Sequence, residues 1–458
     1  MIKIYNSLTK QKEEFVPINP GKVKMYVCGI TVYDYCHIGH ARSALAFDVV
    51  ARYFRYMGYD VDYVRNITDI DDKIIQRANE NHQSCDEVTQ KFIVAMLEDE
   101  QALKMQSYNQ APRATEYVAE IIKMIGQLIE KNYAYVADNG DVYYSIPAFK
   151  SYGKLSKRDL EQLRVGERVA VVSEKHDPLD FVLWKLAKPG EPSWPSPWGA
   201  GRPGWHSECS VMSSICLGEQ IDIHGGGMDL MFPHHENEIA QAEAILGKPF
   251  VNIWMHNGFL MVNDEKMSKS LKNFLTIREV LEKHDPETMR FLYLSAHYRS
   301  PLSYSDAQLE QARKTLERFY VAIRNVPKGE PLKNSIYEKE FQDAMNDDFN
   351  VPLALSVLHE LTTEINQLKA KQDMLSVSYA ALLVKLGNVL GVLFESPEQF
   401  LQADTTALDT AKIEELIAKR NQARKDKDWP LADQLRLELD AMNIVLEDTV
   451  GQTTWRKK

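Results

Sequence analysis

The chain has 458 residues, 44% hydrophobic and 26% charged, proportions that are typical of globular proteins and that exclude wholesale disorder or a collagen-like fibre. Its 54 basic and 65 acidic residues give a net charge of −11, which argues against nonspecific DNA coating but allows a local basic face that binds RNA. Five cysteines without a Cys-x-x-Cys pair, and no signal peptide or membrane-length apolar segment, predict a cytoplasmic protein in a reducing compartment.

The first part of the chain alternates between strand and helix patterns. Residues 23–28 predict an apolar strand, residues 41–57 a helix that stops at Gly58, and residues 60–67 a second strand. Residues 68–71 resemble a capping box that opens another helix. This order predicts an α/β fold built on a Rossmann-like, doubly wound parallel sheet.

Residues 116–200 interrupt the alternation and predict an insertion between two halves of the sheet. A helix pattern over 115–132 precedes a hairpin over 135–144, whose two-residue turn is Asn139-Gly140. The insertion ends in a segment rich in proline and glycine with three tryptophans, Trp194, Trp198 and Trp205. Such a segment indicates a packed or ligand-lining loop rather than a plain linker.

The α/β pattern then resumes and gives way to helices. We predict a helix, a strand, a glycine loop, a helix and a strand over residues 207–217, 220–224, 225–227, 233–246 and 251–256. From about residue 276 the patterns are nearly all helical. Expected helices start at Pro286 and at Ser305 or Asp306, and others span 352–369 and 375–393. Two last helices and a strand pair near 444–446 and 453–455 follow.

Two short motifs carry side chains suited to binding phosphate. His37-Ile38-Gly39-His40 lies between a strand and a helix, where glycine allows close backbone approach and the helix N-terminus offers free N–H groups. Lys266-Met267-Ser268-Lys269-Ser270 places two lysines three apart, which suits a cationic clamp on pyrophosphate. Taken alone, each motif is explained as readily by a turn with incidental histidines or by an exposed Lys/Ser loop.

Together, the two motifs resemble the paired signatures of class I aminoacyl-tRNA synthetases. Further segments narrow the resemblance to cysteinyl-tRNA synthetases: residues 26–34, 66–73, 204–210, 224–230, 344–350 and 446–449. The resemblance covers essentially the whole chain. It implies an ATP-dependent ligase that joins L-cysteine to its tRNA through a cysteinyl-adenylate.

The resemblance also gives each part of the chain an expected task. We expect two catalytic halves around a connective insertion, a signature-loop and stem-contact region, a helical bundle and an anticodon-recognition module. Their expected bounds are 1–115 and 201–262 for the catalytic halves, 116–200 for the insertion, then 263–308, 309–398 and 399–458.

Several side chains are candidate metal ligands: Cys28, Cys209, Cys216, His224, His234, His235, Glu236 and Glu238. His234 and Glu238 are four apart on a predicted helix and share a face, while His235 and Glu238, three apart, are the competing pair. Two thiolates, an imidazole and a carboxylate suit zinc, although spacing alone leaves the site open. The resemblance assigns one zinc per chain to Cys28, Cys209, His234 and Glu238.

A zinc site would explain how cysteine is selected, because metal coordination deprotonates a thiol. Serine, alanine and valine offer no such ligand, and the short insertion leaves no room for a large editing domain. The resemblance implies an amino-acid pocket formed by Thr31, Thr68, Trp205, His224 and Asp229, with Asp229 on the substrate ammonium. Without it, Trp205 is explained as a packed loop residue, His224 as a strand-end residue and Asp229 as a solvated carboxylate.

The resemblance makes four residues of the phosphate motifs catalytic, namely His37, His40, Lys266 and Lys269. Gly39 and Ser268 complete the expected ATP site, and Mg is expected to accompany ATP. The histidines would contact phosphates, and the lysines would neutralise the departing pyrophosphate.

The C-terminal segment has a different charge balance from the rest of the chain. Residues 411–458 carry a net charge of +1, whereas the residues before them carry −12. Its candidate tRNA-binding residues are Lys419, Arg420, Arg424, Lys425, Lys427, Trp429 and Trp455. The cations would contact phosphates and the tryptophans would stack on unpaired bases, although a charge run is usually a solvated helix face. We expect tRNA, ATP and L-cysteine as partners and, without a long heptad seam, a monomer.

Two other functions share some of these features. A tRNA-independent ligase that joins activated cysteine to an amino sugar would have the same zinc site and signatures, but the basic terminal module argues against it. A non-catalytic, synthetase-like RNA-binding protein should have lost signature residues, and none is lost here.

Overall fold

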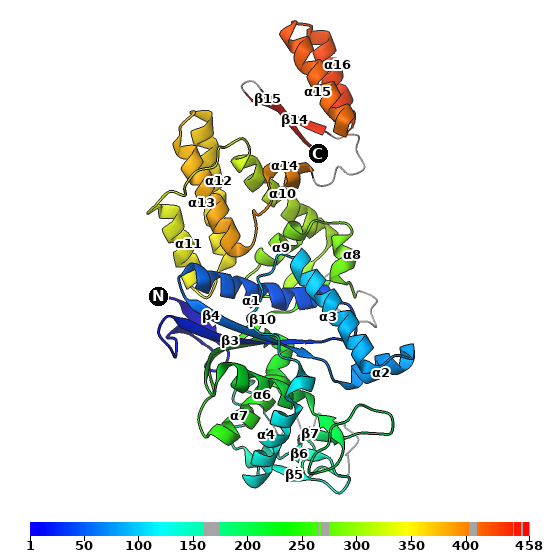
Figure 1. Ribbon diagram of the computed structural model, residues 1–458. Helices are drawn as coiled ribbons and strands as arrows, with labels where there is room; N and C mark the ends of the chain where they lie inside the picture. Colours follow the sequence, from blue (N-terminus) through cyan, green and yellow to red (C-terminus); the bar gives the residue numbers. More distant parts are fainter. Residues whose placement is uncertain are drawn as a thin grey trace. The chain divides into compact units, whose positions relative to one another are not determined.

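The computed structural model describes residues 1–159, 174–262, 265–266, 274–402, 410–442, 444–449 and 452–457. Its central sheet is parallel, in the order β10-β9-β3-β4. The strands are β3 (Lys22–Thr31), β4 (Asp60–Thr68), β9 (Ile221–Gly227) and β10 (Val251–Asn257). Helix α1 (Ile38–Tyr56) covers one face, and α6 (Trp205–Leu217), with α7 (Glu236–Leu246) beside it, covers the other (Figure 1). This arrangement confirms the predicted doubly wound α/β fold.

The strand order reverses between β3 and β9. Strand β3 is the first of the four in the chain; β4 pairs with one of its edges, and β9 followed by β10 adds to the other. In sheets of this kind, ligands bind outside the carboxyl ends of the strands at such a reversal. Residues near the ends of β3 and β9 therefore lie where a site is expected.

Histidines rather than apolar residues determine where α1 begins. The side chain of His37 accepts a hydrogen bond from the backbone N–H of His40, so the helix starts at Ile38, three residues before the predicted start. Farther along, its apolar side chains are buried against the sheet, among them Leu45, Phe47, Val50 and Phe54. The first signature is therefore built into the first turn of the helix.

The predicted capping box after β4 is wrong. Thr68 is the last residue of β4 and pairs with Thr31 of β3. Helix α2 (Asp72–Asn81) is capped by Asp71, whose carboxylate accepts a hydrogen bond from the backbone N–H of Lys73 at 2.8 Å. Because aspartate caps a helix as well as threonine does, the four-residue pattern did not fix the helix start. Helix α3 (Cys85–Ala102) follows.

An antiparallel sheet lies in sequence between the two halves of the parallel sheet. Its strands pair in chain order and are β5 (Ala134–Val136), β6 (Val142–Tyr144), β7 (Phe181–Leu186) and β8 (Gly201–Pro203). Helices η1 (Ala114–Tyr117), α4 (Val118–Glu130) and η2 (Ile146–Ala148) accompany it. Ile121, Ile125 and Leu128 of α4 share a core with Val142 and Leu183 of the sheet.

The three glycines predicted as a loop belong to β9. Gly225, Gly226 and Gly227 pair with Met255, His256 and Asn257 of β10. A Cβ on Gly225 would lie 2.2 Å from Cε1 of Phe47, and a Cβ on Gly226 would lie 2.9 Å from Cε1 of His235. Close packing on both faces, rather than a turn, therefore requires these glycines.

The segments that flank the central sheet are short. Helices η3 (Met228–Leu230) and η4 (Met231–His235) precede α7, which starts three residues later than predicted. The short strands are β1 (Lys3–Asn6), β2 (Gln11–Glu14), β11 (Leu260–Val262), β12 (Glu265–Lys266) and β13 (Leu302–Tyr304), and the sequence patterns predicted none of them. Helices α8 (Ile277–Leu281) and α9 (Pro286–Leu294) follow, and α9 starts at Pro286 as predicted, with Asp285 as its cap.

The rest of the chain is mainly helical. Its elements are α10 (Asp306–Ile323), α11 (Ile336–Asn346), α12 (Val351–Ala370), α13 (Leu375–Leu390), α14 (Pro397–Gln402), α15 (Thr410–Lys425), α16 (Trp429–Ala441), β14 (Ile444–Thr449) and β15 (Gln452–Lys457). The chain divides into two compact units, and the second comprises residues 310–335, 358–388 and 392–458. Among the described helices, none is both long enough and apolar enough to cross a membrane.

Candidate active site

A bulge near the end of β3 sets the position of Cys28. The pairing with β4 passes from Val27 opposite Arg65 to Ile30 opposite Ile67, so that Cys28 and Gly29 together lie opposite one residue of β4. Such a bulge bends the strand and redirects a side chain. Cys28 is buried at the strand reversal, in the predicted position at the carboxyl end of β3.

The four predicted zinc ligands come together around this cysteine. Cys209 is on α6, Glu238 is on α7, and His234 lies in the turn before α7. Sγ of Cys28 lies 3.4 Å from Oε1 of Glu238, and Nε2 of His234 lies 3.1 Å from the same oxygen. One ligand atom from each of the four residues lies within 4.8 Å of the others, so this group could hold a metal ion.

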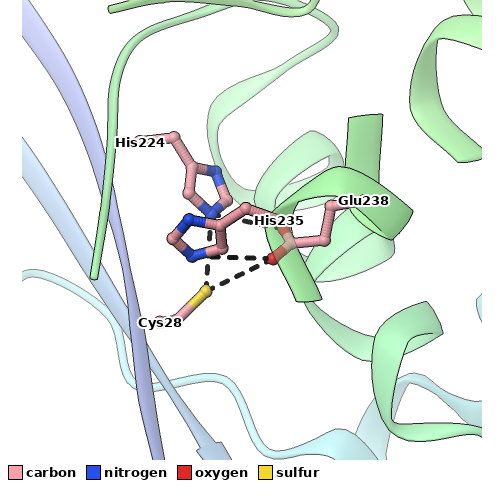
Figure 2. Close-up of side chains that lie close together, drawn as sticks. All are labelled: Cys28, His224, His235 and Glu238. Atoms are coloured by element: carbon pink, nitrogen blue, oxygen red, sulfur yellow. Dashed lines mark hydrogen bonds and ion pairs between the residues drawn. The ribbon is translucent and has the colours of Figure 1, made fainter. Parts of the chain in front are cut away.

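A second group shares Cys28 and Glu238 with the first, and Figure 2 shows it. In it, Nε2 of His224 lies 3.4 Å from Sγ of Cys28, and Nε2 of His235 lies 3.9 Å from Oε1 of Glu238. His224, at the strand reversal, and His235, the predicted competitor of His234, therefore both approach the same place. Distances alone do not choose between the two groups.

Burial governs the protonation of these groups. It raises the pKa of Cys28 well above the ordinary value for a thiol, raises the pKa of Cys209, and lowers the pKa of His234 to about 3. Burial alone would raise the pKa of Glu238, but His224 and His234 outweigh that effect and hold it below the ordinary value. A metal ion would favour deprotonation of the buried thiols.

The donor set fits a zinc ion. The first group offers two sulfurs, one imidazole nitrogen and one carboxylate oxygen, all from buried residues, which are ligands that zinc accepts in fourfold coordination. Oε2 of Glu238 lies 3.2 Å from Nε2 of His224, and Nε2 of His235, in the second group, is a buried atom without a hydrogen-bond partner. Buried polar atoms normally have one, so this nitrogen is consistent with a cation bound within the cluster.

The structure brings some of the predicted pocket residues next to the cluster. The ring of Trp205 stacks on that of His234 with centroids 4.3 Å apart. Thr31 and Thr68 pair at the ends of β3 and β4, and the hydroxyl of Thr68 donates to Oε2 of Glu208 at 2.8 Å. Asp229 is exposed in η3, directly after β9. Thr68 is therefore already hydrogen-bonded within the protein.

The two histidines of the first signature form a reciprocal cap on α1. Nδ1 of His37 accepts from the backbone N–H of His40 at 3.2 Å, and Nδ1 of His40 accepts from the backbone N–H of His37 at 3.3 Å. Their rings stack with centroids 3.4 Å apart. Burial lowers the pKa of His40 well below its ordinary value, so this ring is a neutral hydrogen-bonding group at pH 7. Gly39 lies between them in the first turn.

The second signature lies only partly within the described residues. The backbone of Lys266 pairs with Met261 in the β11–β12 hairpin, whereas Ser268 and Lys269 lie outside the described residues. The chain just beyond the signature contacts the start of α1: the N–H of Ile38 donates to the carbonyl of Leu275 at 3.0 Å. The N–H of Ile277 likewise donates to the carbonyl of Cys36 at 2.9 Å, so two backbone hydrogen bonds join the segment after the second signature to the first signature and the residue before it.

Two of the residues predicted to contact tRNA, Trp455 and Arg420, are buried within the terminal module. Trp455 is buried, and its indole N–H donates to Glu414 at 2.7 Å, so the ring is not available to stack on a base. Arg420 is buried and donates two hydrogen bonds to Asp448. Each has a structural partner, which residue type and charge alone did not reveal. The remaining candidates are exposed, namely Lys419, Arg424, Lys425, Lys427 and Trp429.

Several buried or half-buried polar residues near the cluster are not among the predicted site residues. Nδ1 of His206 lies 3.0 Å from Nδ1 of His234, and Nδ1 of His235 lies 2.8 Å from Nε2 of His256. Asn66 is also buried, opposite the β3 bulge. Asn66 and His206 both lie inside the segments that carry the family resemblance, but only the fold shows what they contact.

Comparisons with known proteins agree along the whole chain. Residues 14–314 match the family described as tRNA synthetases class I (C) catalytic domain, residues 340–395 a DALR domain, and residues 409–456 a cysteinyl-tRNA ligase anticodon binding domain. The cysteine–tRNA ligases of Tolumonas auensis and Photorhabdus laumondii are each 57% identical to the chain, with 100% of both sequences covered. That of Coxiella burnetii is 55% identical over 458 residues, again with 100% of both covered.

Solved structures with low sequence identity share the fold. A methionyl-tRNA synthetase of Mycobacterium tuberculosis bound by methionyl-adenylate has a TM-score of 0.59 at 14% identity, over 90% of this chain and 96% of that one. A leucyl-tRNA synthetase of Agrobacterium radiobacter, in a ternary complex with tRNA, also has a TM-score of 0.59, at 12% identity, over 83% and 86%.

Proposed function

Because the chain belongs to the cysteine–tRNA ligase family of class I aminoacyl-tRNA synthetases, we propose that it attaches L-cysteine to its tRNA in two steps. The carboxylate of cysteine attacks the α-phosphate of ATP, which gives cysteinyl-adenylate and pyrophosphate. A ribose hydroxyl of the terminal adenosine of the tRNA then takes the cysteinyl group, and AMP leaves. The observation that carries this proposal is the buried Cys/His/Glu cluster at the strand reversal.

We assign the zinc to Cys28, Cys209, His234 and Glu238 rather than to the group with His224 and His235. His234 and His235 each lie within hydrogen-bond distance of another histidine, His206 and His256 respectively, so this contact favours neither group. The number of sulfurs does, because the first group offers two and the second only one, and zinc in proteins is commonly held by thiolates. When bound there, zinc would deprotonate the thiol of the incoming cysteine and so favour it over serine and alanine.

The protein's own residues position the substrates and stabilise charge. The space for the amino acid lies between Trp205, which stacks on His234, and His224. Thr31, Thr68 and Asp229 complete the proposed pocket. His37 and His40 hydrogen-bond the phosphates of ATP, which approaches the backbone at Gly39. Lys266, Ser268 and Lys269 bind the pyrophosphate as it departs. No nucleophilic side chain is required, because positioning and charge stabilisation lower the barrier.

The proposed division of labour follows the bounds expected from the sequence. Residues 1–115 and 201–262 form the catalytic domain around the insertion 116–200, and residues 263–308 carry the signature loop and contact the tRNA stem. Residues 309–398 form a helical bundle, and residues 399–458 recognise the anticodon. Lys419, Arg424, Lys425, Lys427 and Trp429 are its proposed tRNA contacts. The enzyme acts as a cytoplasmic monomer with Mg accompanying ATP; the five free thiols support a reducing compartment.

The test is cysteine-dependent exchange of pyrophosphate into ATP, followed by charging of purified tRNA. The proposal expects both reactions, with cysteine preferred over serine. Exchange without charging, but with transfer of cysteine to an amino sugar, would favour the tRNA-independent ligase instead. Tight tRNA binding without exchange would indicate a non-catalytic RNA-binding protein.

A further inference from the structure

We propose that Asn66 is a positioning residue for the two thiol ligands of the zinc site, Cys28 and Cys209. The inference rests on the proposed zinc assignment and goes beyond it, because Asn66 is not itself a ligand. The residue lies on β4, an element that supplies none of the four proposed ligands. Its side chain is buried, with 2% of the residue exposed.

The first contact of Asn66 is with the bulge that carries Cys28. The backbone N–H of Gly29 donates to Oδ1 of Asn66 at 2.8 Å. In the bulge, two residues of β3, Cys28 and Gly29, lie opposite the single residue Asn66 of β4, and the amide side chain supplies the acceptor for this N–H. The strands approach so closely here that a Cβ on Gly29 would lie 1.7 Å from the backbone oxygen of Asn66. Asn66 therefore fixes the backbone next to Cys28.

The second contact of the same oxygen is with the other thiol. Sγ of Cys209 lies 3.6 Å from Oδ1 of Asn66 and donates to it while the thiol is protonated. Once zinc takes the place of that proton, the sulfur would remain packed against the amide without this hydrogen bond. Cys209 is on α6, which packs against β3 and β4 on one face of the sheet. A single amide oxygen thus contacts the backbone beside one proposed ligand and the sulfur of the other.

A chain of hydrogen bonds holds the amide in this orientation. Nδ2 of Asn66 donates to Oγ1 of Thr68 at 3.4 Å, and Oγ1 of Thr68 donates to Oε2 of Glu208 at 2.8 Å. Glu208 directly precedes Cys209 on α6, so the chain returns to the helix that carries the thiol. Thr68 and Glu208 are both buried.

These hydrogen bonds join α6 to the bulge of β3 and so fix the helix relative to the strand. Because a backbone N–H can only donate, the amide oxygen must face Gly29, and the hydroxyl of Thr68 accepts from the other end of the amide. Without the amide, no shared side chain would hold Cys28 and Cys209 at a fixed position relative to each other. Outer partners of metal ligands typically contribute 10- to 100-fold to metal affinity, and we expect an effect on the order of 10-fold or more here.

The experiment uses the full-length protein with Asn66→Ala and Asn66→Leu. The leucine variant keeps the side-chain volume and lacks the amide, so it tests the contact if the alanine variant is poorly folded. The matched control is Asn6→Ala: Asn6 is also buried, and its Oδ1 accepts from the backbone N–H groups of Leu8 and Trp254 at 3.1 and 3.2 Å. Zinc affinity is measured by competition with a chromophoric chelator. The absorption of the Co²⁺-substituted protein reports on the metal–sulfur bonds.

We expect the zinc dissociation constant to rise at least about 10-fold in both Asn66 variants, with an altered sulfur-to-cobalt absorption band. The KM for cysteine should rise while that for ATP stays the same, and Asn6→Ala should keep the parent affinity and spectrum. Parent-like zinc affinity and spectrum in both Asn66 variants would overturn the inference, as would an equal loss in Asn6→Ala. If the parent protein itself bound no zinc, the proposed zinc site would fail, a result distinct from a failure of Asn66 alone.

Discussion

Arg420 donates two hydrogen bonds to Asp448, at 2.9 and 2.8 Å, and so joins helix α15 to strand β14 within the terminal module. Its place in a run of basic residues predicts a contact with tRNA phosphate. In the structure, Nη1 and Nη2 of the guanidinium each donate to one carboxylate oxygen of Asp448, a bidentate geometry that suits arginine better than lysine. Arg420 is therefore part of the framework of the module.

We expect Arg420→Ala to destabilise the terminal module by about 1 kcal/mol, because Asp448 is 38% exposed at its side chain and solvent screens the pair. Thermal unfolding or limited proteolysis of the full-length enzyme would show the effect. Lys427→Ala, at an exposed position of the same module, is the control and should leave stability unchanged. Equal stability of the two variants would contradict the structural role.

The same pair predicts a pH dependence. The hydrogen bonds from Arg420 hold the pKa of Asp448 well below its ordinary value. The stabilisation is therefore fully present above the ordinary aspartate pKa of about 3.9 and is lost as the pH falls through the lower, folded-state pKa. The difference in stability between the parent and Arg420→Ala should be constant from neutral to mildly acidic pH and shrink below it. A difference that grows on acidification would contradict this.

The two tryptophans of the module should behave differently. Trp429 is 58% exposed and Trp455 is 2% exposed. If Trp429 stacks on an unpaired base, Trp429→Ala should raise the KM for tRNA by an amount that corresponds to about 1–3 kcal/mol, without loss of stability. Trp455→Ala should lower stability, because it removes a core residue of the module. Unchanged charging kinetics in Trp429→Ala would remove it from the tRNA site.

Lys425 and Lys427 provide a test of phosphate contacts. Replacing both with glutamine should raise the KM for tRNA and reduce the salt dependence of binding by about one unit of slope for each lost contact. Pyrophosphate exchange should be unaffected, because the site for activation lies in other parts of the chain. Binding of tRNA measured at several salt concentrations is the deciding experiment, and an unchanged slope would show that the two lysines are only a solvated face.

Lys269→Ala should slow adenylate formation about 10²- to 10³-fold, which corresponds to the loss of one charge contact of about 2.7–4 kcal/mol in the transition state. Cysteine binding and zinc content should stay at the parent level. Pre-steady-state measurement of pyrophosphate release separates the two effects. A parent-like rate would show that another cation stabilises the leaving pyrophosphate.

Sequence patterns predicted the fold where local chemistry and global packing agree. Apolar strands such as β3 and β4 with the helix between them could be recognised, because burial on both faces of a parallel sheet leaves an apolar pattern. The ends of elements were harder. His37 caps α1 and Asp71 caps α2, and both competed with other plausible starts.

Features that depend on close approach were not predictable. The glycines of β9 have a turn-like composition, and only the positions of Phe47 and His235 show that they belong in a strand. Likewise, nothing in the sequence around Asn66 distinguishes it from other polar residues near the ends of strands. Its contact with Cys209 joins residues 143 positions apart, which a single sequence does not reveal.

The proposed selection of cysteine depends on a zinc ion that is held by two thiolates and receives the thiol of the substrate. X-ray absorption at the zinc edge of the purified enzyme tests it directly, because sulfur at about 2.3 Å is distinguished from nitrogen or oxygen at about 2.0–2.2 Å. We expect two sulfur ligands without substrate, three with L-cysteine, and no change with L-serine. A single sulfur without substrate would place the metal in the group with His224 and His235, and no added sulfur with L-cysteine would contradict thiolate recognition.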